Sequence, residues 1–471
     1  MWDERRDPPL TRRWGDGAET ARGKAKSSLG RPPVPPKRAR QQHLSSAAWG
    51  RKEPQHLLDG LGPRVPSPPA SRKLRIVGGD MERKNPSREA VLITGGSGYL
   101  GFRLGSALAK RKVDVILFDI SKPTQEMPKG VKFVQGDICV IREVEEALQG
   151  MSYVFHIASY GMSGRDQLNP RRIEEVNIRG TNNIIESCRR VGISILIYTS
   201  TYNVVFGGQV IENGDESWPY LPLHLHPDHY SRTKALAEMK VLEANGTVLR
   251  DGQGILRTCA IRPAGIYGPG EQRHLPRIVK YIEQGWFRCV YGDPSSLVDF
   301  VHVDNLVQAH ILAAEALGAT KNHVAAGQAY FISDGRPVNN FEFFRPLVEG
   351  LGYTYPSLHL PLSLVYFFAL VTELVHVAVG RLYNFQPLLT RTEVYKTGVT
   401  HFFSLAKARR ELDYKPQPYS LGEVVAWFRA HGHGREFSKS SEKHCIRNAS
   451  LVFLVALMVL LWLLTFCWSF F

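Results

Sequence analysis

The sequence predicts a doubly wound α/β fold built on a mainly parallel β-sheet. From residue 89 onward, short β-rich runs alternate with stretches that have the apolar spacing of a helix. Strands that alternate with helices of about ten or more residues imply right-handed crossovers, which make neighbouring strands parallel. The 471 residues are 43% hydrophobic and 22% charged, as in an ordinary globular protein of more than one domain.

The predicted elements follow one another in a regular order. The first strand, EAVLITGG, is followed by the helical run LGFRLGSALAKR and by a second strand, VDVILFD. VKFVQGD and MSYVFHIAS are the next two strands, and EEVNIRGTNNIIESCRRV is a helix. ISILIYTS is then the fifth strand, and the β-branched and aromatic content of all five runs is typical of buried strands.

Residues 1–88 are predicted to be a disordered, basic, proline-rich tail. They contain 12 of the 29 prolines, and their 20 Lys+Arg against 9 Asp+Glu carry +11 of the formal charge of +15. Such a segment cannot bury enough apolar surface to offset the entropy of ordering. Because most of the charge lies there, the folded part has no strongly basic surface, and we expect no nucleic-acid partner.

The last 22 residues, SLVFLVALMVLLWLLTFCWSFF (450–471), contain no charge and predict a transmembrane helix. With 436–449 as a basic linker, this segment is expected to be a tail anchor that leaves the folded domain in the cytosol, most simply at the endoplasmic reticulum. A second apolar stretch, 358–379, is interrupted by Glu373 and His376. We expect it to lie in the membrane plane or to cover a substrate, with a true span as the alternative.

A glycine-rich turn between the first strand and the first helix predicts a dinucleotide site. In TGGSGYLG, the glycines at 95, 98 and 101 let the backbone turn tightly and approach a diphosphate at the N-terminus of the following helix. Asp119 ends the second strand, 18 residues after Gly101. A carboxylate there accepts hydrogen bonds from the adenosine ribose and repels a 2′-phosphate, so NAD is favoured over NADP as the cofactor.

A tyrosine and a lysine one helical turn apart predict acid–base chemistry. In YSRTK, Tyr230 and Lys234 share a helix face. A phenol titrates near 10, so acting as a base near neutral pH requires its pKa to fall by about 3, which is about 4 kcal/mol. Lys234 and an oxidised nicotinamide ring could supply this stabilisation. The strand that ends in IYTST places hydroxyl groups between this pair and the glycine turn.

Taken together, these motifs resemble the extended short-chain dehydrogenase/reductases, which have a Rossmann-like fold. RPAGIYGPG at 262–270 and FVHVDNL at 300–306 resemble segments of these extended members. NGDESWPYLP at 213–222 resembles their 3β-hydroxysteroid dehydrogenase branch, and the chain as a whole resembles family 42E within that branch. The resemblance covers about residues 89–435. It implies an NAD-binding domain over 89–260, to which 296–335 return, and a smaller substrate domain formed by 261–295 and 336–435.

The resemblance also implies roles for single residues. Thr201 would orient the substrate oxygen, with Ser200 as the reserve choice, and Asn177 would help to complete a proton relay. Lys234 would also hold the nicotinamide ribose. The remaining cofactor contacts would come from the glycine turn and from the later strand ends: Tyr99, Leu100, Asp137, Ile138, Ala158 and Pro263.

The sequence thus predicts an NAD-dependent oxidation of a secondary 3β-hydroxyl in a steroid or sterol, at a membrane. A nucleotide-sugar epimerase or dehydratase, and a catalytically silent NAD-binding membrane scaffold, are the alternatives. Homodimerisation is common in such enzymes, and membrane lipid is a further expected partner. The histidine-rich loop LPLHLHPDHY leads into the Tyr230 helix and is predicted to hold no metal, since hydride transfer needs none.

Overall fold

The computed structural model describes residues 76–77, 89–162, 166–167, 169–379 and 389–437. The chain divides into two units, Met1–Pro69 and Ala70–Phe471, and every described residue belongs to the second. The transmembrane helix predicted for 450–471 and nearly all of the linker predicted for 436–449 lie outside the described residues.

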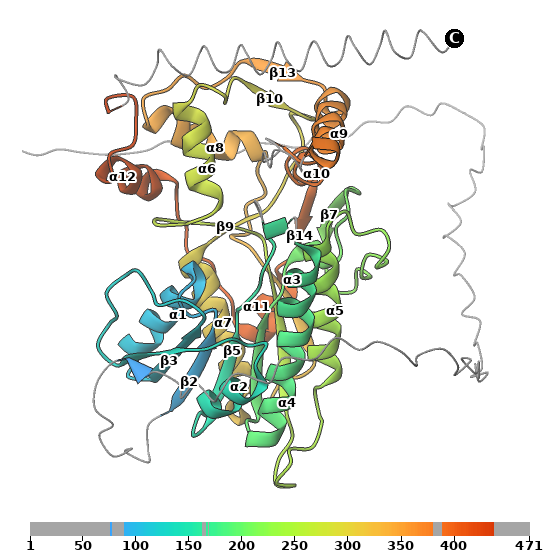
Figure 1. Cartoon of the computed structure of the whole chain (residues 1–471). Helices are drawn as coiled ribbons and strands as arrows, with labels where there is room; N and C mark the ends of the chain where they lie inside the picture. Colours follow the sequence, from blue (N-terminus) through green and yellow to red (C-terminus); the bar gives the residue numbers. More distant parts are fainter. Residues whose placement is uncertain (1–75, 78–88, 163–165, 168, 380–388, 438–471) are drawn as a thin grey trace, which may run out of the picture. The chain divides into compact units, whose positions relative to one another are not determined.

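An eight-stranded sheet in the order β1-β4-β3-β2-β5-β6-β8-β12 forms the centre of the described unit (Figure 1). Its strands are parallel apart from β1, which pairs antiparallel with β4. The strands are β1 (Ile76–Val77), β2 (Ala90–Thr94), β3 (Asp114–Asp119), β4 (Val131–Gln135), β5 (Tyr153–His156), β6 (Ile195–Thr199), β8 (Arg257–Pro263) and β12 (Gln328–Ile332). The chain runs outward from β2 to β4 and resumes at β5 on the other side of β2. This order places a topological switch between β2 and β5, where ligands bind in such sheets.

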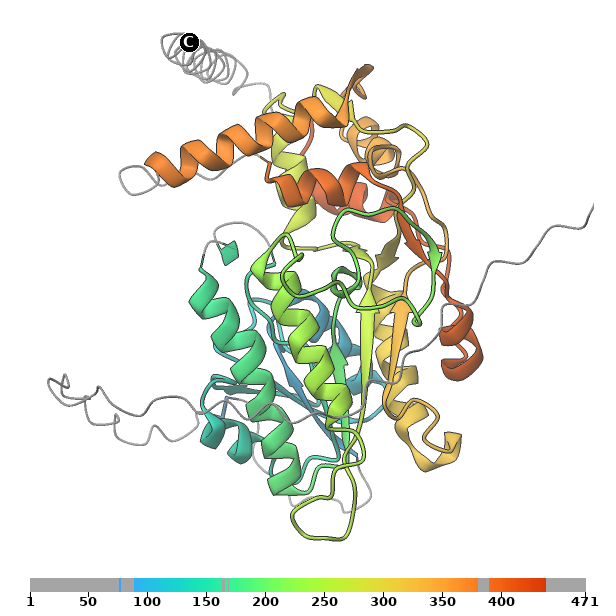
Figure 2. The same cartoon turned by 90° about the vertical axis from the view of Figure 1, so that its right-hand side faces the viewer.

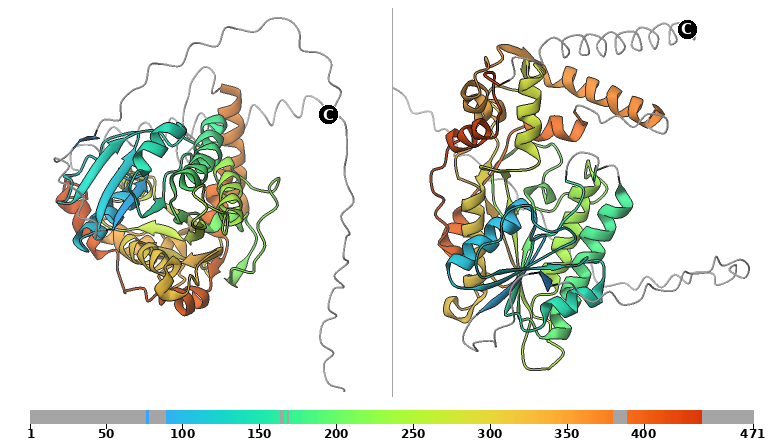
Figure 3. Two further views of the ribbon diagram at one scale, coloured as in Figure 1. Left: turned by 90° about the horizontal axis from the view of Figure 1, so that it is seen from below. Right: turned by 60° about the vertical axis from the view of Figure 1, so that its left-hand side comes forward.

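Helices cover both faces of the sheet, as Figure 3 shows end-on. One face packs on α1 (Tyr99–Lys110), α7 (Val303–Leu317) and α11 (Ala406–Leu412). The other packs on α2 (Ile141–Leu148), α4 (Thr181–Val191) and α5 (His229–Glu243). A short helix α3 (Pro170–Glu174) and a π-helical turn η2 (Glu175–Gly180) lead directly into α4. The predicted doubly wound fold is therefore confirmed.

The remaining elements form a second lobe beyond the carboxyl ends of the strands (Figure 1). Three two-stranded pairs, β10–β13, β11–β9 and β14–β7, connect its helices. Its elements are β7 (Ile211–Gly214), β9 (Gly265–Tyr267), α6 (His274–Glu283), β10 (Cys289–Tyr291), β11 (Phe300–His302), α8 (Asn340–Gly350), β13 (Leu358–Leu360), α9 (Leu362–Val379), α10 (Arg391–Gly398), β14 (His401–Phe403) and α12 (Gly422–Ala430). The 3₁₀ turns η3 (Tyr202–Val204) and η4 (Ala319–Lys321) complete the described elements.

The structure changes several predicted boundaries. Within the predicted tail, β1 (Ile76–Val77) extends the sheet, because two β-branched residues pair with the edge strand β4. β8 continues to Pro263, beyond the expected domain boundary at 260. β11 pairs with β9 rather than with the main sheet, so the returning segment begins at α7. Conversely, Leu405–Tyr414 pack into the core of the lobe that holds the main sheet, because α11 lies against α7 and β12.

The apolar stretch predicted over 358–379 forms β13 and the helix α9. Figure 2 shows α9 extending away from the rest of its lobe. Along the part of the chain that the structure describes, none of the helices combines the length and the apolar character that crossing a bilayer requires.

Candidate active site

A cavity of about 980 Å³ lies between the carboxyl ends of the strands and the second lobe. This volume is at the upper end of the range of small-molecule sites, about 300–1,000 Å³. All but one of the predicted site residues line it: Gly95, Gly98, Tyr99, Leu100, Gly101, Asp119, Asp137, Ile138, Ala158, Ser200, Thr201, Tyr230, Lys234 and Pro263. The exception is Asn177. One cavity therefore unites the glycine turn with the Tyr–Lys pair.

The glycine turn has room for backbone but not for side chains. Gly95 has φ +69°, and a Cβ there would lie 2.8 Å from the backbone nitrogen of Ala158. A Cβ on Gly101 would lie 2.3 Å from the Gly95 carbonyl oxygen. Gly98 begins α1 with no side-chain cap and no acidic residue in the first turn. The helix N-terminus is consequently free to donate hydrogen bonds to a diphosphate.

Asp119 lies where the adenosine ribose of a dinucleotide is expected. It ends β3, and its carboxylate accepts hydrogen bonds from the backbone N–H groups of Ser97 (3.1 Å) and Ser121 (3.3 Å). Burial raises the pKa of this carboxyl, and the same N–H groups oppose that rise. The uncapped turn, the close glycine backbone and this carboxylate together fit NAD, as the sequence predicts.

Asp137, a predicted cofactor contact, is held by an ion pair. The Asp137 carboxylate pairs with the Arg172 guanidinium at 3.0 Å and accepts a hydrogen bond from the Cys139 N–H at 2.9 Å. Burial acts to raise the pKa of Asp137, but the Cys139 N–H and Arg172 outweigh it and the pKa is lowered. These contacts hold Asp137 in place at the cavity wall, which Ile138 also lines.

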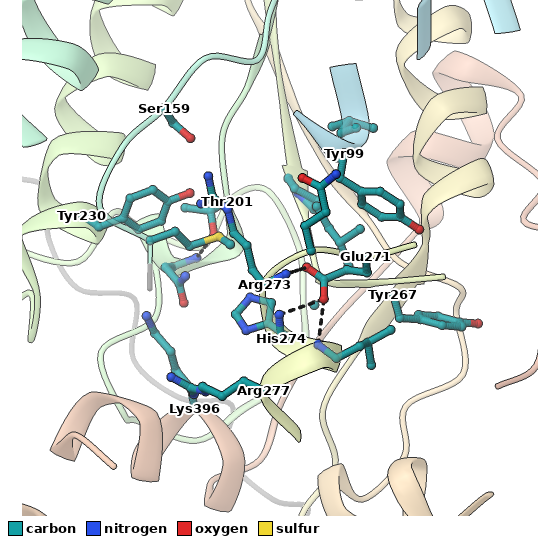
Figure 4. A pocket seen from close by; sticks show the side chains of 18 of the residues that line it. Tyr99, Ser159, Thr201, Tyr230, Tyr267, Glu271, Arg273, His274, Arg277 and Lys396 are labelled. Carbon is teal, nitrogen blue, oxygen red and sulfur yellow. Dashed lines mark hydrogen bonds between the residues drawn. The ribbon is translucent and has the colours of Figure 1, made fainter. Parts of the chain in front are cut away.

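Tyr230 is buried near the start of α5, with its hydroxyl in the cavity beside Thr201 and Arg273 (Figure 4). The helix is capped by Asp228, whose carboxylate accepts the Ser231 N–H at 2.6 Å. Burial raises the pKa of Tyr230 to about 12, while the positive charge of Arg273 and the Ser159 hydroxyl act to lower it. The phenol is therefore placed for acid–base chemistry, but burial makes its ionisation costly.

Lys234 lies one turn further along α5 and is also buried. Its ammonium donates to the Thr199 carbonyl at the end of β6 and lies 4.1 Å from the centre of the Tyr198 ring. Burial lowers the pKa of Lys234 to about 7, which the nearby Glu238 carboxylate opposes. The part expected of Lys234 in lowering the pKa of Tyr230 stays a prediction, and the Arg273 guanidinium acts in the same direction.

Both hydroxyl residues proposed to orient the substrate oxygen line the cavity. Thr201 lies near Tyr230, and its Oγ1 accepts the Asn203 N–H at 3.3 Å, which caps η3. The Ser200 hydroxyl is buried and has no hydrogen-bond partner among the described residues. Thr201 therefore stays the first choice, and Ser200 stays the reserve.

Asn177 lies behind the cavity wall. It is buried in the π-helical turn η2, and its amide oxygen accepts the Tyr160 N–H at 2.8 Å. Its amide nitrogen donates to the Tyr160 carbonyl and to the Thr233 hydroxyl on α5, each at 3.0 Å. Through these contacts Asn177 holds the loop after β5 against the Tyr230 helix. Its expected part in a proton relay stays a prediction.

Sequence reasoning missed the charged residues that the second lobe adds to the cavity. Arg273, His274 and Arg277 come from the start of α6, and Glu393 and Lys396 come from α10. Aromatic and aliphatic side chains complete this part of the wall: Tyr281, Trp286, Phe287, Tyr291, Phe341, Phe344, Leu360, Val365 and Phe368. No spacing signal joins segments so far apart in the chain, although QRHLPR directly follows the recognised GPGE.

The fold and the site define a dinucleotide-binding oxidoreductase of the short-chain dehydrogenase/reductase type. More particularly, the chain belongs to the 3-beta hydroxysteroid dehydrogenase/isomerase family, which residues 92–362 match. Short-chain dehydrogenase/reductase family 42E member 1 from Homo sapiens is 68% identical over 385 residues, covering 81% of this chain and 98% of the relative. Sterol-4-alpha-carboxylate 3-dehydrogenase, decarboxylating, from Mus musculus is 34% identical over 346 residues, covering 74% and 92%.

Solved structures of more distant proteins share the fold. The dTDP-glucose 4,6-dehydratase DesIV from Streptomyces venezuelae, with NAD and TYD bound, has a TM-score of 0.56 at 21% identity and covers 72% of this chain and 97% of its own. UDP-glucose 4-epimerase from Thermus thermophilus, in complex with NAD, has a TM-score of 0.53 at 22% identity and covers 72% and 99%.

Proposed function

We propose that the protein is an NAD-dependent dehydrogenase that oxidises the 3β-hydroxyl of a steroid or sterol. NAD, when bound, supplies the acceptor for the hydride from the carbinol carbon. The Tyr230 phenolate takes the hydroxyl proton, and Thr201 hydrogen-bonds to the substrate oxygen. Lys234, which already donates to the Thr199 carbonyl, holds the ribose side of the cofactor.

One observation carries this proposal: the cavity joins a dinucleotide cradle to Tyr230 and then to a wall of aromatic side chains. The glycine turn and Tyr230 lie on the same cavity, as does the aromatic set that includes Phe287, Phe341 and Phe344. A large apolar wall with few convergent polar groups suits a rigid hydrocarbon that carries one hydroxyl. The relatives named above as sterol and hydroxysteroid dehydrogenases support the same substrate class.

Purified full-length protein with NAD and a panel of 3β-hydroxysteroids tests the proposal. We expect NADH formation, followed by its ultraviolet absorbance, with at least one 3β-alcohol and not with its 3α-epimer. Tyr230→Phe should lower the rate by about 1,000-fold or more while NAD binding persists. Tyr153→Phe is the matched control, because that tyrosine lies on β5 and its hydroxyl contacts Glu89, outside the cavity. Turnover that survives Tyr230→Phe would contradict the mechanism.

The same assay separates the two alternative functions. Of the second-lobe cations that line the cavity, Arg277 and Lys396 pair with carboxylates, and Arg273 could contact the diphosphate of a sugar nucleotide. UDP-glucose and dTDP-glucose therefore belong in the panel, and their conversion without steroid oxidation would favour an epimerase or dehydratase. NAD binding with no turnover on any alcohol would instead favour a silent scaffold.

We further propose that the protein works at a membrane, tail-anchored by residues 450–471 with the catalytic domain in the cytosol, at the endoplasmic reticulum. The exposed apolar side chains of α9 support this: Leu364, Phe367, Phe368 and Leu374 are 41–60% exposed. Phe368 and Val365 of the same helix line the cavity. A lipid substrate could thus pass from the bilayer into the cavity without crossing water.

Fractionation and protease protection of the full chain in cells test this location. We expect a membrane pellet that resists carbonate, and digestion of the catalytic domain when protease is added to intact microsomes. Phe367→Glu should lower turnover of membrane-embedded sterol several-fold and leave turnover of a detergent-dispersed steroid unchanged. A soluble full-length chain, or protection of the domain inside microsomes, would contradict the proposal.

A further inference from the structure

Arg273 reaches the reacting end of the cavity from the second lobe. It directly precedes α6, and the Glu271 carboxylate fixes its backbone by accepting the N–H groups of Arg273 (2.8 Å), His274 (2.8 Å) and Leu275 (2.7 Å). Glu271 is thereby used to hold the turn. The guanidinium of Arg273 points toward Tyr230 and Thr201 (Figure 4).

The other cations of the second lobe that line the cavity already have carboxylate partners. Arg277 pairs with Glu393 at 2.6 Å, and Lys396 pairs with Asp228 at 3.1 Å. Within the described residues, no carboxylate oxygen lies within ion-pair distance of the Arg273 guanidinium. Its charge is therefore available to a group that develops negative charge in the cavity.

The groups around the Tyr230 phenol come from several elements of both lobes. On α5, Lys234 is directed to the Thr199 carbonyl, and the Asp228 charge at the helix start is offset by Lys396 of α10. From β6 and η3, Tyr198 and Tyr202 face the phenol as neutral rings whose pKa values burial raises. The loop after β5 contributes the Ser159 hydroxyl, and the turn before α6 contributes Arg273.

We propose that Arg273 is the protein cation that stabilises the phenolate of Tyr230, in addition to the Tyr–Lys–Thr set. This inference rests on the proposed oxidation and adds a residue to it. When the phenolate is protonated by the substrate hydroxyl, a charge next to Arg273 is neutralised, and it is restored when Tyr230 releases that proton to solvent. Arg273 acts through Tyr230 and is thus a positioning residue.

Electrostatics gives the physical reason. Burial raises the pKa of Tyr230 to about 12, and Arg273 is the first of the groups that act against this rise. Lys234 is less suited to this task, because burial lowers its pKa to about 7. In a cavity from which substrate excludes water, a nearby positive charge acts more strongly than it does in solvent.

The pH dependence of kcat/KM in Arg273→Gln tests the proposal. We expect the acidic limb of the profile to move up by about one pH unit or more, so that activity falls about tenfold near neutral pH and recovers toward the wild-type plateau at high pH. Arg273→Lys should restore most of the shift. Arg232→Gln is the control, because it removes the same charge from α5 outside the cavity and should leave the limb in place.

Two results would overturn the proposal. One is an unchanged acidic limb with a KM raised equally at all pH values, which would make Arg273 a substrate-binding group. The other needs no turnover and comes from an ultraviolet difference titration of the NAD-bound chain, with the signal of Tyr230→Phe subtracted. An Arg273→Gln variant in which the pKa of the Tyr230 phenol is unchanged would contradict the proposal. That titration needs no substrate. If the pKa of Tyr230 shifts in Arg273→Gln while the steroid assay fails, only the proposed substrate is rejected.

Discussion

A buried ion pair ties the Tyr230 helix to the sheet. The Glu238 carboxylate of α5 accepts hydrogen bonds from Nε (2.9 Å) and a terminal nitrogen (2.6 Å) of Arg262 on β8, and from the Tyr220 hydroxyl at 2.7 Å. Both charged side chains are almost fully buried. Glu238 also acts to raise the pKa of Lys234, against the larger effect of burial. The pair thus links the position of the helix to the charge of Lys234.

Glu238→Gln should destabilise the fold strongly, because it leaves the buried Arg262 charge without a carboxylate. We expect the free energy of unfolding in urea to fall by about 3–5 kcal/mol, the usual cost of breaking one partner of a buried pair. Glu243→Gln, near the end of the same helix, is the control and should change it by less than about 0.5 kcal/mol. A loss below about 1 kcal/mol for Glu238→Gln would show that the pair is dispensable.

Asp299 predicts a pH dependence of stability. This cavity-lining carboxyl is buried and accepts the Phe403 N–H at 2.8 Å, and burial raises its pKa from 3.8 to about 7. Between these values the folded state binds more protons than the unfolded state, so Asp299 makes stability fall as pH rises from about 4 to about 7, by at most about 1.4 kcal/mol per pH unit. Relative to wild type, Asp299→Asn should gain stability across that interval in urea melts. A pH-independent difference between the two proteins would contradict the assignment.

At the residue scale, the sequence predicted the site residues that belong to local motifs. The glycine turn, Asp119, Tyr230 and Lys234 belong to motifs whose spacing implies their geometry, and all line the cavity. Arg273 and Lys396 could not be placed, because their approach depends on how the second lobe folds over the sheet. The Tyr–Lys motif also could not predict where the Lys234 ammonium points, because it donates a hydrogen bond to the Thr199 carbonyl.

Among the elements, the π-helical turn η2 is the local irregularity that supports the site. A single long helix was predicted over 174–191, and the structure divides it into the end of α3, η2 and α4. The wider turn coincides with the buried Asn177, which contacts both the loop after β5 and α5. Such turns are often retained where function requires a particular side-chain position.

Asn177→Ala should loosen this junction. It leaves the Tyr160 N–H and carbonyl and the Thr233 hydroxyl without this partner, which should cost about 1–3 kcal/mol of unfolding free energy. Because Asn177 lies behind the wall, NAD affinity should change less than kcat. Asn182→Ala on the exposed face of α4 is the control. Unchanged stability together with lost turnover would instead support the direct role of Asn177 in a proton relay.

The β2–α1 turn gives the sharpest test of the cofactor site. In Gly101→Ala, the added methyl group would meet the Gly95 carbonyl oxygen at 2.3 Å, so the turn must move away from the diphosphate position. We expect NAD affinity, measured by calorimetry, to fall by about tenfold or more. Gly422→Ala at the start of α12 meets only the Ser420 hydroxyl at 3.3 Å and should leave the affinity unchanged. Equal NAD affinity in both variants would move the cofactor elsewhere.

The sequence predicted the strands β2 to β6 and did not predict β8, β12 or the short strands of the second lobe. The strands from β2 to β6 are buried runs of four to six residues, which a single-sequence pattern can identify. The three-residue strands β9, β10 and β13 gain their partners only through tertiary contact. The return of α11 to the NAD-binding core was missed for the same reason, since its partners α7 and β12 are about 80 residues or more away in the chain.

At the scale of the whole described unit, the two lobes share one cavity but have different chemistry. The sheet side supplies backbone, hydroxyls and Asp119, which suit a dinucleotide. The second lobe supplies aromatic side chains, the paired cations Arg277 and Lys396, and Arg273. A pattern of strands and helices can predict the dinucleotide side of the cavity, because that side is built on the local turn between β2 and α1. The second side is assembled from segments between 267 and 401 and emerges only from the fold.

The most direct test of the proposed oxidation follows the hydrogen that leaves the carbinol carbon. A 3β-hydroxysteroid that carries deuterium on the carbinol carbon is incubated with full-length protein and NAD, and the reduced cofactor is analysed by mass spectrometry. The account predicts NADH that is one mass unit heavier, with the 3-ketone formed in equal amount, and neither product with Tyr230→Phe. Unlabelled NADH, or ketone formed at the wild-type rate without Tyr230, would contradict it.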